Sequence, residues 1–263
     1  FDILVNIGQH PKEVSDAVTI IEKIGHFLDQ ENTKLFREYI AKGVSNKEIS
    51  SLIAENLNIP NILKNASTNW DGGYTMAGLM GHGDAFVIRD PNGIRPAFWY
   101  EDDEVFVVTS ERPVIQTAFN VKWEEIKELK PGNALIIKKN NLNQELEINT
   151  PKEIKKCSFE RIYFSRGTDK DIYKERLKLG RLVVSQILVA IDNDLRNTVF
   201  SFIPNTAEMS YYGMIKELEN HLSAMKKVEI KELDSKARNY EEKLDKILAF
   251  RTRAEKIMVK DAK

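Results

Sequence analysis

The chain has 263 residues, 42% of them hydrophobic and 30% charged, which is enough for one large domain or two modest ones. Its formal net charge of −1 argues against a general nucleic-acid surface, because such a surface needs a concentrated excess of Lys and Arg. The Lys-rich C-terminal region is interleaved with acidic residues and indicates a solvated helix face, although a polyanion site is left open.

The single cysteine, Cys157, excludes an internal disulfide framework and suits a reducing, cytoplasmic environment. The sequence contains no signal-peptide pattern and no stretch near the roughly 20 apolar residues of a membrane span, so we expect no membrane association. The chain begins without Met, inside an apolar run, and ends on another. We therefore expect a fragment of a longer protein.

Residues 11–66 are predicted to be helical. The pattern favours a first helix that begins at Pro11, a second over residues 32–41, and a third that begins at Ser45 with a capping-box sequence and is closed by Pro60. Helices this rich in Leu and Ile are typical packing elements.

From Trp70 the hydrophobic period changes to that of strands. Short turns separate the expected strands, which predicts antiparallel pairing, and a short helix is expected over residues 114–119. The polar segment 138–156 is either a hairpin or a linker, and we place a domain boundary between residues 150 and 151. The expected strands cover residues 74–80, 85–88, 98–100, 105–108 and 134–137.

Beyond the boundary, strand and helix patterns alternate, which is typical of an α/β layer with a parallel sheet. We expect strands over residues 159–164 and 198–203, and helices over residues 171–192 and 208–222. The last forty residues are predicted to form a highly charged helical tail.

The most informative stretch is the turn between two of the strands, Arg89-Asp90-Pro91-Asn92-Gly93. Pro91 presets one backbone angle, and Asn92-Gly93 tolerates left-handed conformations. This could be an ordinary hairpin with a polar tip. It could also be a backbone fixed by hydrogen bonds from its charged side chains.

The sequence of residues 89–96, which includes this turn, resembles the Arg-Asp-Pro-x-Gly-Ile-Arg-Pro signature of class II glutamine amidotransferases. Arg89, Asp90, Gly93 and Arg95 stand in the matching positions, so the resemblance implies that they form a structural motif of a glutaminase. It also implies an α+β fold, with residues 1–150 as the C-terminal part of an αββα N-terminal-nucleophile sandwich with antiparallel sheets.

A second stretch of sequence narrows the resemblance to one family within this class. Residues 157–166, Cys-Ser-Phe-Glu-Arg-Ile-Tyr-Phe-Ser-Arg, followed by residues 172–180, are similar to the domain junction of amidophosphoribosyltransferases. The resemblance covers residues 70–222. It implies that residues 151–263 begin a phosphoribosyltransferase domain.

The same resemblance implies an activity. The parent protein would hydrolyse glutamine and transfer ammonia to phosphoribosyl pyrophosphate in the presence of Mg²⁺, giving 5-phosphoribosylamine for purine synthesis. A homo-oligomer is also implied. The alternative is a non-catalytic homologue that serves as a regulatory or assembly scaffold.

The family nucleophile is an N-terminal Cys whose own α-amino group acts as the base. This chain starts with Phe1, so we expect no catalytic residue and no glutaminase activity in it. Cys157 is internal and is interpreted as a small apolar residue. One cysteine cannot hold an iron–sulfur cluster, so this cofactor is not expected from the chain.

Residues 202–208 resemble an Ile-Pro-Glu-Thr-Ser stretch that ends the first transferase strand in the family, although Asn205 and Ala207 depart from it. The resemblance makes Thr206 a candidate for substrate or metal contact. Thr206 could equally be the N-cap of the following helix. The acidic phosphate-site loop of the family does not occur in the sequence.

The four histidines show no spacing typical of metal ligands. His82 lies between two glycines in an expected turn, and a surface hydrogen-bonding role is favoured there over catalysis.

Overall fold

The computed structural model describes residues 2–6, 8–9, 13 and 15–260, which form two units, residues 1–157 and residues 158–263. The predicted helix start at Pro11 lies outside the described residues. The helices of the first unit are α1 (Asp2–Asn6), α2 (Asp16–Ala41), α3 (Asn46–Asn56), α4 (Ile59–Ala66), α5 (Arg112–Phe119) and the 3₁₀ turn Trp123–Glu125.

The helical segment differs from the sequence prediction in two places. Helix α2 runs without interruption over 26 residues, so the separate helix predicted over residues 32–41 is wrong. Neither Gly nor Pro stands between Leu28 and Asn32 to break it. Pro60 does not close α3 but lies in the first turn of α4, where its missing N–H leaves no bond unmade.

Ser45 is the N-cap of α3, as predicted, but the capping box does not form. Its hydroxyl donates to the Glu48 carboxylate at 2.6 Å instead of accepting from a main-chain N–H.

Two antiparallel sheets follow the helices, which confirms the predicted strand pattern. One sheet has the order β1-β2-β6-β7 and the other the order β4-β3-β5. Segment 138–156 contains a strand that pairs with β6, so its first part is the hairpin arm. The strands are β1 (Thr75–Leu79), β2 (Ala85–Arg89), β3 (Phe98–Glu101), β4 (Phe106–Thr109), β5 (Lys127–Glu128), β6 (Asn133–Ile137) and β7 (Gln144–Glu147).

The alternation of side chains along β2 shows how the layers are stacked. Phe86 and Ile88 pack with Ile62 and Leu63 of α4 on one face of the first sheet. Val87 packs on the opposite face with Trp99 of β3, so the second sheet covers that face.

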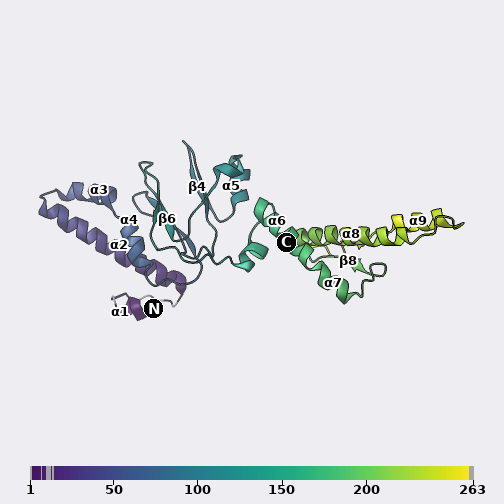
Figure 1. Ribbon diagram of the computed structural model, residues 1–263. Coiled ribbons are helices and arrows are strands. Elements are labelled where there is room, and N and C mark those ends of the chain that lie inside the picture. The colour runs from purple at the N-terminus through teal and green to yellow at the C-terminus, as the bar shows by residue number, and fades with distance from the viewer. Residues whose placement is uncertain (1, 7, 10–12, 14, 261–263) are drawn as a thin grey trace. The chain divides into compact units, whose positions relative to one another are not determined.

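The outer face of the second sheet is covered in turn by a helix. Phe98 of β3 packs with Ile115 of α5. The first unit is therefore an αββα sandwich, and the α+β fold class is confirmed. Figure 1 shows α4 beside β6, α2 beside α4, and α5 beside β4.

The second unit is mostly helical. It has one short parallel pair, β8 with β9, in place of the longer strands predicted there. Its elements are a π-helical turn (Glu160–Phe164), α6 (Lys170–Leu182), α7 (Val184–Ala190), β8 (Val199–Phe200), α8 (Glu208–Lys231), α9 (Tyr240–Ala249) and β9 (Arg253–Ala254).

The strand predicted over residues 159–164 is wrong, because this run is helical. Arg161 explains the difference: its guanidinium pairs with Glu175 of α6 at 2.5 and 2.6 Å, and its carbonyl accepts from Arg176 at 3.1 and 3.2 Å. These bonds to α6 take the place of a strand partner. Similarly, the helix predicted over residues 171–192 is two helices, α6 and α7.

Two glycines set the contact between α6 and α8. A Cβ on Gly180 would collide with the carbonyl oxygen of Ser210, and a Cβ on Gly213 would collide with the carbonyl oxygen of Leu177. The two backbones therefore approach as closely as they do only because neither position carries a side chain.

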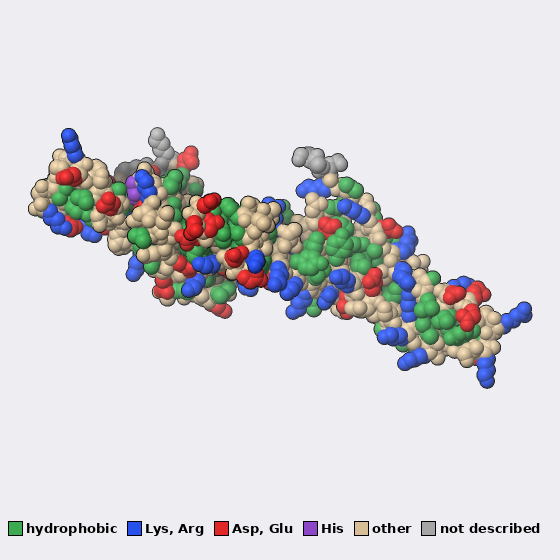
Figure 2. Space-filling model, turned by 90° about the horizontal axis from the view of Figure 1, so that it is seen from above, with side chains coloured by type: hydrophobic (Ala, Val, Ile, Leu, Met, Phe, Trp, Pro, Cys, Tyr) green, Lys and Arg blue, Asp and Glu red, His purple; other side chains and the backbone are tan. Residues whose placement is uncertain are grey.

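The core of the second unit is small and includes Val184, Leu188, Phe200 and Leu218. Much apolar surface remains uncovered: Figure 2 shows hydrophobic side chains gathered on one face of this unit. Its exposed apolar residues include Phe159, Tyr163, Leu182, Val189, Ile203 and Ile257.

Candidate functional site

Asp90, the centre of the predicted turn motif, is fully buried, and its carboxylate accepts four main-chain hydrogen bonds. Oδ1 accepts from the N–H groups of Asn92 at 3.1 Å and Ile94 at 3.0 Å. Oδ2 accepts from Arg95 at 3.0 Å and from Tyr74 at 3.3 Å. A buried carboxylate is costly unless it is paired, and here the turn backbone supplies the donors. We call residues 90–95 the Asp90 turn.

Gly93 is required by the shape of this turn. Its φ is +62°, which L side chains rarely adopt. A Cβ here would also lie 2.9 Å from Cγ of Pro131 and 3.4 Å from Nη2 of Arg89. A larger residue would therefore strain the backbone and push these neighbours apart.

Arg89 fixes the turn by hydrogen bonds from its side chain to the main chain of the turn. Its buried guanidinium donates from Nε to the Arg95 carbonyl at 2.7 Å and from Nη2 to the Gly93 carbonyl at 3.3 Å. Nη1 donates to the Leu129 carbonyl and to the Glu128 carboxylate, the latter at 2.9 Å. Because Arg89 ends β2 and Glu128 belongs to β5, one side chain joins the turn to both sheets.

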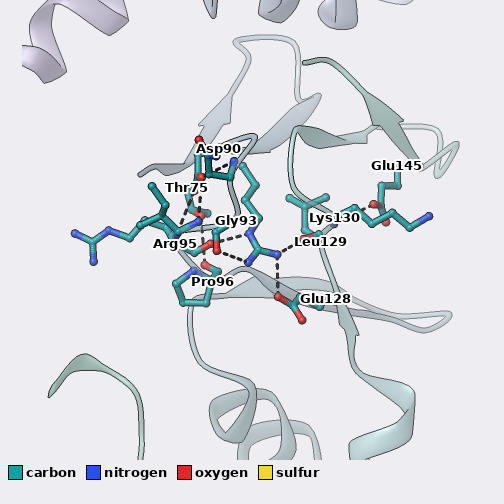
Figure 3. Close-up of polar contacts among 12 residues, drawn as sticks. Thr75, Asp90, Gly93, Arg95, Pro96, Glu128, Leu129, Lys130 and Glu145 are labelled. Atoms are coloured by element: carbon teal, nitrogen blue, oxygen red, sulfur yellow. Dashed lines mark hydrogen bonds and ion pairs between the residues drawn. The ribbon is translucent and has the colours of Figure 1, made fainter. Parts of the chain in front are cut away.

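Arg95 takes part through its main chain, whereas its side chain is exposed. Figure 3 shows this side chain directed away from the Asp90 carboxylate. The structure therefore brings together Arg89, Asp90, Gly93 and the backbone of Arg95, and it presents the Arg95 guanidinium at the surface of a fixed turn.

Tyr74 and Asn149 extend the site and were missed by the sequence analysis. Asn149 Nδ2 donates to Ser67 Oγ at 2.9 Å and lies 3.5 Å from the Tyr74 hydroxyl. Burial, together with the negative charge of Asp90, raises the pKa of Tyr74 to about 12. The Tyr74 phenol therefore stays protonated at neutral pH. Only tertiary contacts join these residues, and no local sequence signal marks them.

His82 lies at the tip of the β1–β2 hairpin, with Nε2 3.0 Å from Oδ2 of the buried Asp84. Lys138 Nζ donates to the same carboxylate at 2.6 Å, and the Lys139 N–H donates at 2.9 Å. Burial acts to raise the pKa of Asp84, but the interactions with Lys138, Lys139 and His82 outweigh it and hold this pKa below its ordinary value. His82 Nε2 lies near this carboxylate without hydrogen-bond geometry, so the hydrogen-bonding role predicted for His82 stays a prediction.

Thr206 belongs to the second unit. The predicted strand over residues 198–203 is only Val199–Phe200, so it ends six residues before Thr206. The N-cap of α8 is Ala207, which also excludes the capping role for Thr206. Its contact with a substrate or metal stays a prediction.

Cys157 is half-buried and precedes a helical turn instead of the predicted strand. Within the described ranges, no group of three or more His, Cys, Asp or Glu side chains could hold a metal ion. No helix among the same residues is long and apolar enough to cross a membrane.

Comparison with known proteins found no matching family model. The chain is 31% identical over 147 residues to the amidophosphoribosyltransferase of Lachancea kluyveri, covering 52% of this chain and 28% of that protein. It is 30% identical over 136 residues to the amidophosphoribosyltransferase of Bacillus subtilis, covering 49% and 27%. The chain thus spans little more than a quarter of the length of these relatives.

A solved B. subtilis glutamine phosphoribosylpyrophosphate amidotransferase, complexed with ADP and GMP, aligns with a TM-score of 0.49 at 22% identity, covering 71% of this chain and 41% of the other. The sequence matches are the stronger finding. Over about half of its length, the chain is homologous to the amidophosphoribosyltransferases, the family whose motifs its sequence carries.

Proposed function

We propose that this chain is part of a glutamine phosphoribosylpyrophosphate amidotransferase. The whole protein would hydrolyse glutamine and pass ammonia to phosphoribosyl pyrophosphate, giving 5-phosphoribosylamine for purine synthesis. The observation that carries this proposal is the Asp90 turn, built on an αββα sandwich and presenting an exposed Arg95. Sequence similarity to amidophosphoribosyltransferases supports it.

In this proposal the Arg95 guanidinium binds the α-carboxylate of glutamine. The Asp90 carboxylate and the Arg89 guanidinium hold the Arg95 backbone from its N–H and its carbonyl side, respectively. Because both bonds fix the main chain of Arg95, the backbone at this position does not have to be ordered on binding.

The glutaminase nucleophile must come from outside these 263 residues. Cys157 is the only cysteine, and its nitrogen is in a peptide bond, so it has no free α-amino group to act as the base. We therefore propose that the isolated chain does not hydrolyse glutamine.

The transferase half of the proposal needs Mg²⁺ and phosphoribosyl pyrophosphate. The described residues do not fit a metal site, because they contain no group of three or more His, Cys, Asp or Glu side chains that could hold the ion. We propose that any metal site would draw on residues outside this chain. A homo-oligomeric, cytoplasmic protein is part of the same proposal.

The test measures glutamine-dependent ammonia release by the isolated chain and by the full-length protein. We expect none from the chain, and release from the full-length protein whose KM for glutamine rises about tenfold or more in Arg95→Lys. Arg37→Lys, an exposed change on α2, should leave KM unchanged.

Two results would contradict the proposal. Ammonia release by the pure chain, abolished by replacing one of its residues, would place the nucleophile inside it. Absence of release by the full-length protein would favour the non-catalytic homologue instead.

A further inference from the structure

The segment that leads out of the first unit is held by the Asp90 turn. We call residues 150–157 the connector, because they join strand β7 of the first unit to the helical turn that begins the second. Residues 151–156 are all exposed and belong to no helix or strand. A segment of this kind is expected to be mobile unless its backbone is bonded to something fixed.

Three hydrogen bonds join the connector to the turn. The main-chain N–H of Lys152 donates to the Pro91 carbonyl at 2.8 Å, and that of Lys155 donates to the Asn92 carbonyl at 2.9 Å. The Asn92 side chain completes the set, donating from Nδ2 to the Glu153 carbonyl at 2.8 Å. The connector thus lies along the turn for four residues without being a strand.

A second set of bonds fixes the start of the connector. The Gly132 N–H donates to the Asp90 carbonyl at 3.1 Å, and the Gly132 carbonyl accepts from Ile148 and Asn149 at 3.0 and 2.9 Å. Asn149, one residue before the connector, is also bonded to Ser67 at the end of α4. The connector therefore leaves a fixed point and is then held along its length.

We propose that the Asp90 turn and the connector form one coupling unit, in which Asn92 transmits the state of the turn to the chain entering the second unit. Asn92 suits this role because its N–H is held by Asp90 while its carbonyl and its amide both bond the connector. Any change that displaces the turn then frees the connector, and the effect is reciprocal. The proposal stands whether or not the protein hydrolyses glutamine.

The test compares two Asn→Asp substitutions in the same chain. Asn92→Asp removes the donor to Glu153 and places a carboxylate against a carbonyl, while Asp remains acceptable in a turn. Asn140→Asp is the matched control: it adds the same charge to the β6–β7 turn, where only the side-chain oxygen of Asn140 is used, accepting from Leu142.

The readout is amide hydrogen exchange, followed residue by residue by NMR. In Asn92→Asp, the amides of Lys152 and Lys155 should exchange roughly 2- to 10-fold faster, the change expected from one lost hydrogen bond. Tryptic cleavage after Lys155 should rise in parallel. In Asn140→Asp both quantities should stay at the wild-type value. Unchanged exchange in Asn92→Asp, or an equal rise in both variants, would overturn the proposal.

A measurement on the wild-type chain decides the question even if Asn92→Asp does not fold. The amides of Lys152 and Lys155 should exchange in the same opening event as those of Ile94 and Arg95, which donate to Asp90. Exchange of the two lysine amides at the free-chain rate, with Ile94 and Arg95 still protected, would show that turn and connector are not coupled.

Discussion

The buried carboxylate of Asp90 accepts a hydrogen bond from the main-chain N–H of Arg95 at 3.0 Å, so it fixes the main chain of a residue whose side chain is exposed. Three further main-chain donors complete the shell of the carboxylate. This relationship makes the turn sensitive to changes that hardly alter its volume, and the first prediction uses that property.

Replacing Asp90 with Asn should lower the free energy of unfolding of the first unit by about 2–4 kcal/mol. The amide has one acceptor oxygen instead of two, and its NH₂ group faces main-chain donors. Urea unfolding followed by Trp fluorescence measures this, because Trp70, Trp99 and Trp123 all lie in the first unit. Asp103→Asn, in an exposed turn, should change the value by less than about 0.5 kcal/mol; equal effects would refute the prediction.

Arg89→Lys should cost about 2–4 kcal/mol although the charge is kept. An ammonium group cannot reach the Arg95, Gly93 and Leu129 carbonyls in one plane, so buried acceptors are left without donors. The same fluorescence assay applies. Arg37→Lys is the control. If Arg89→Lys lost no more unfolding free energy than this control, the planar arrangement of donors on the guanidinium would not contribute to stability.

Gly180→Ala should destabilise the second unit by about 1–3 kcal/mol or more, because the new methyl group meets the backbone of α8. Gly25→Ala is the matched change in an open part of α2, and it should stabilise by roughly 0.5–1 kcal/mol. Thermal unfolding followed by circular dichroism distinguishes the two signs. Stabilisation by both substitutions would mean that α6 and α8 are not in close contact.

Asp84→Asn should show a pH-dependent loss of stability. The pKa of Asp84 is held below its ordinary value of 3.8, so its contribution is present above that pH and is lost as pH falls through the folded-state pKa. We expect a loss of about 1–3 kcal/mol at pH 7 that shrinks below pH 3.8. Urea titrations at several pH values measure it. Asp29→Asn, exposed on α2, should show no such trend; a constant loss at every pH would contradict the assignment.

The sequence by itself determined most strands of the first unit and the residues of the Asp90 turn, whereas the αββα arrangement was expected from the family resemblance. Strand periodicity and turn chemistry are local signals, and the burial of Phe86 and Ile88 on one face and Val87 on the other follows from them. The position of Gly93 could be predicted for the same reason, since a positive φ is a local requirement.

Only the tertiary structure decided the elements whose partners are distant in sequence. Residues 159–164 are apolar enough for a strand, but the bonds of Arg161 to Glu175 and Arg176 accompany a helical turn. The bonds from Arg89 to Glu128, and from the connector to Pro91 and Asn92, likewise join positions about 40 to 60 residues apart. Periodicity cannot report such contacts, because each depends on where the fold places the partner and not on the local run of residues.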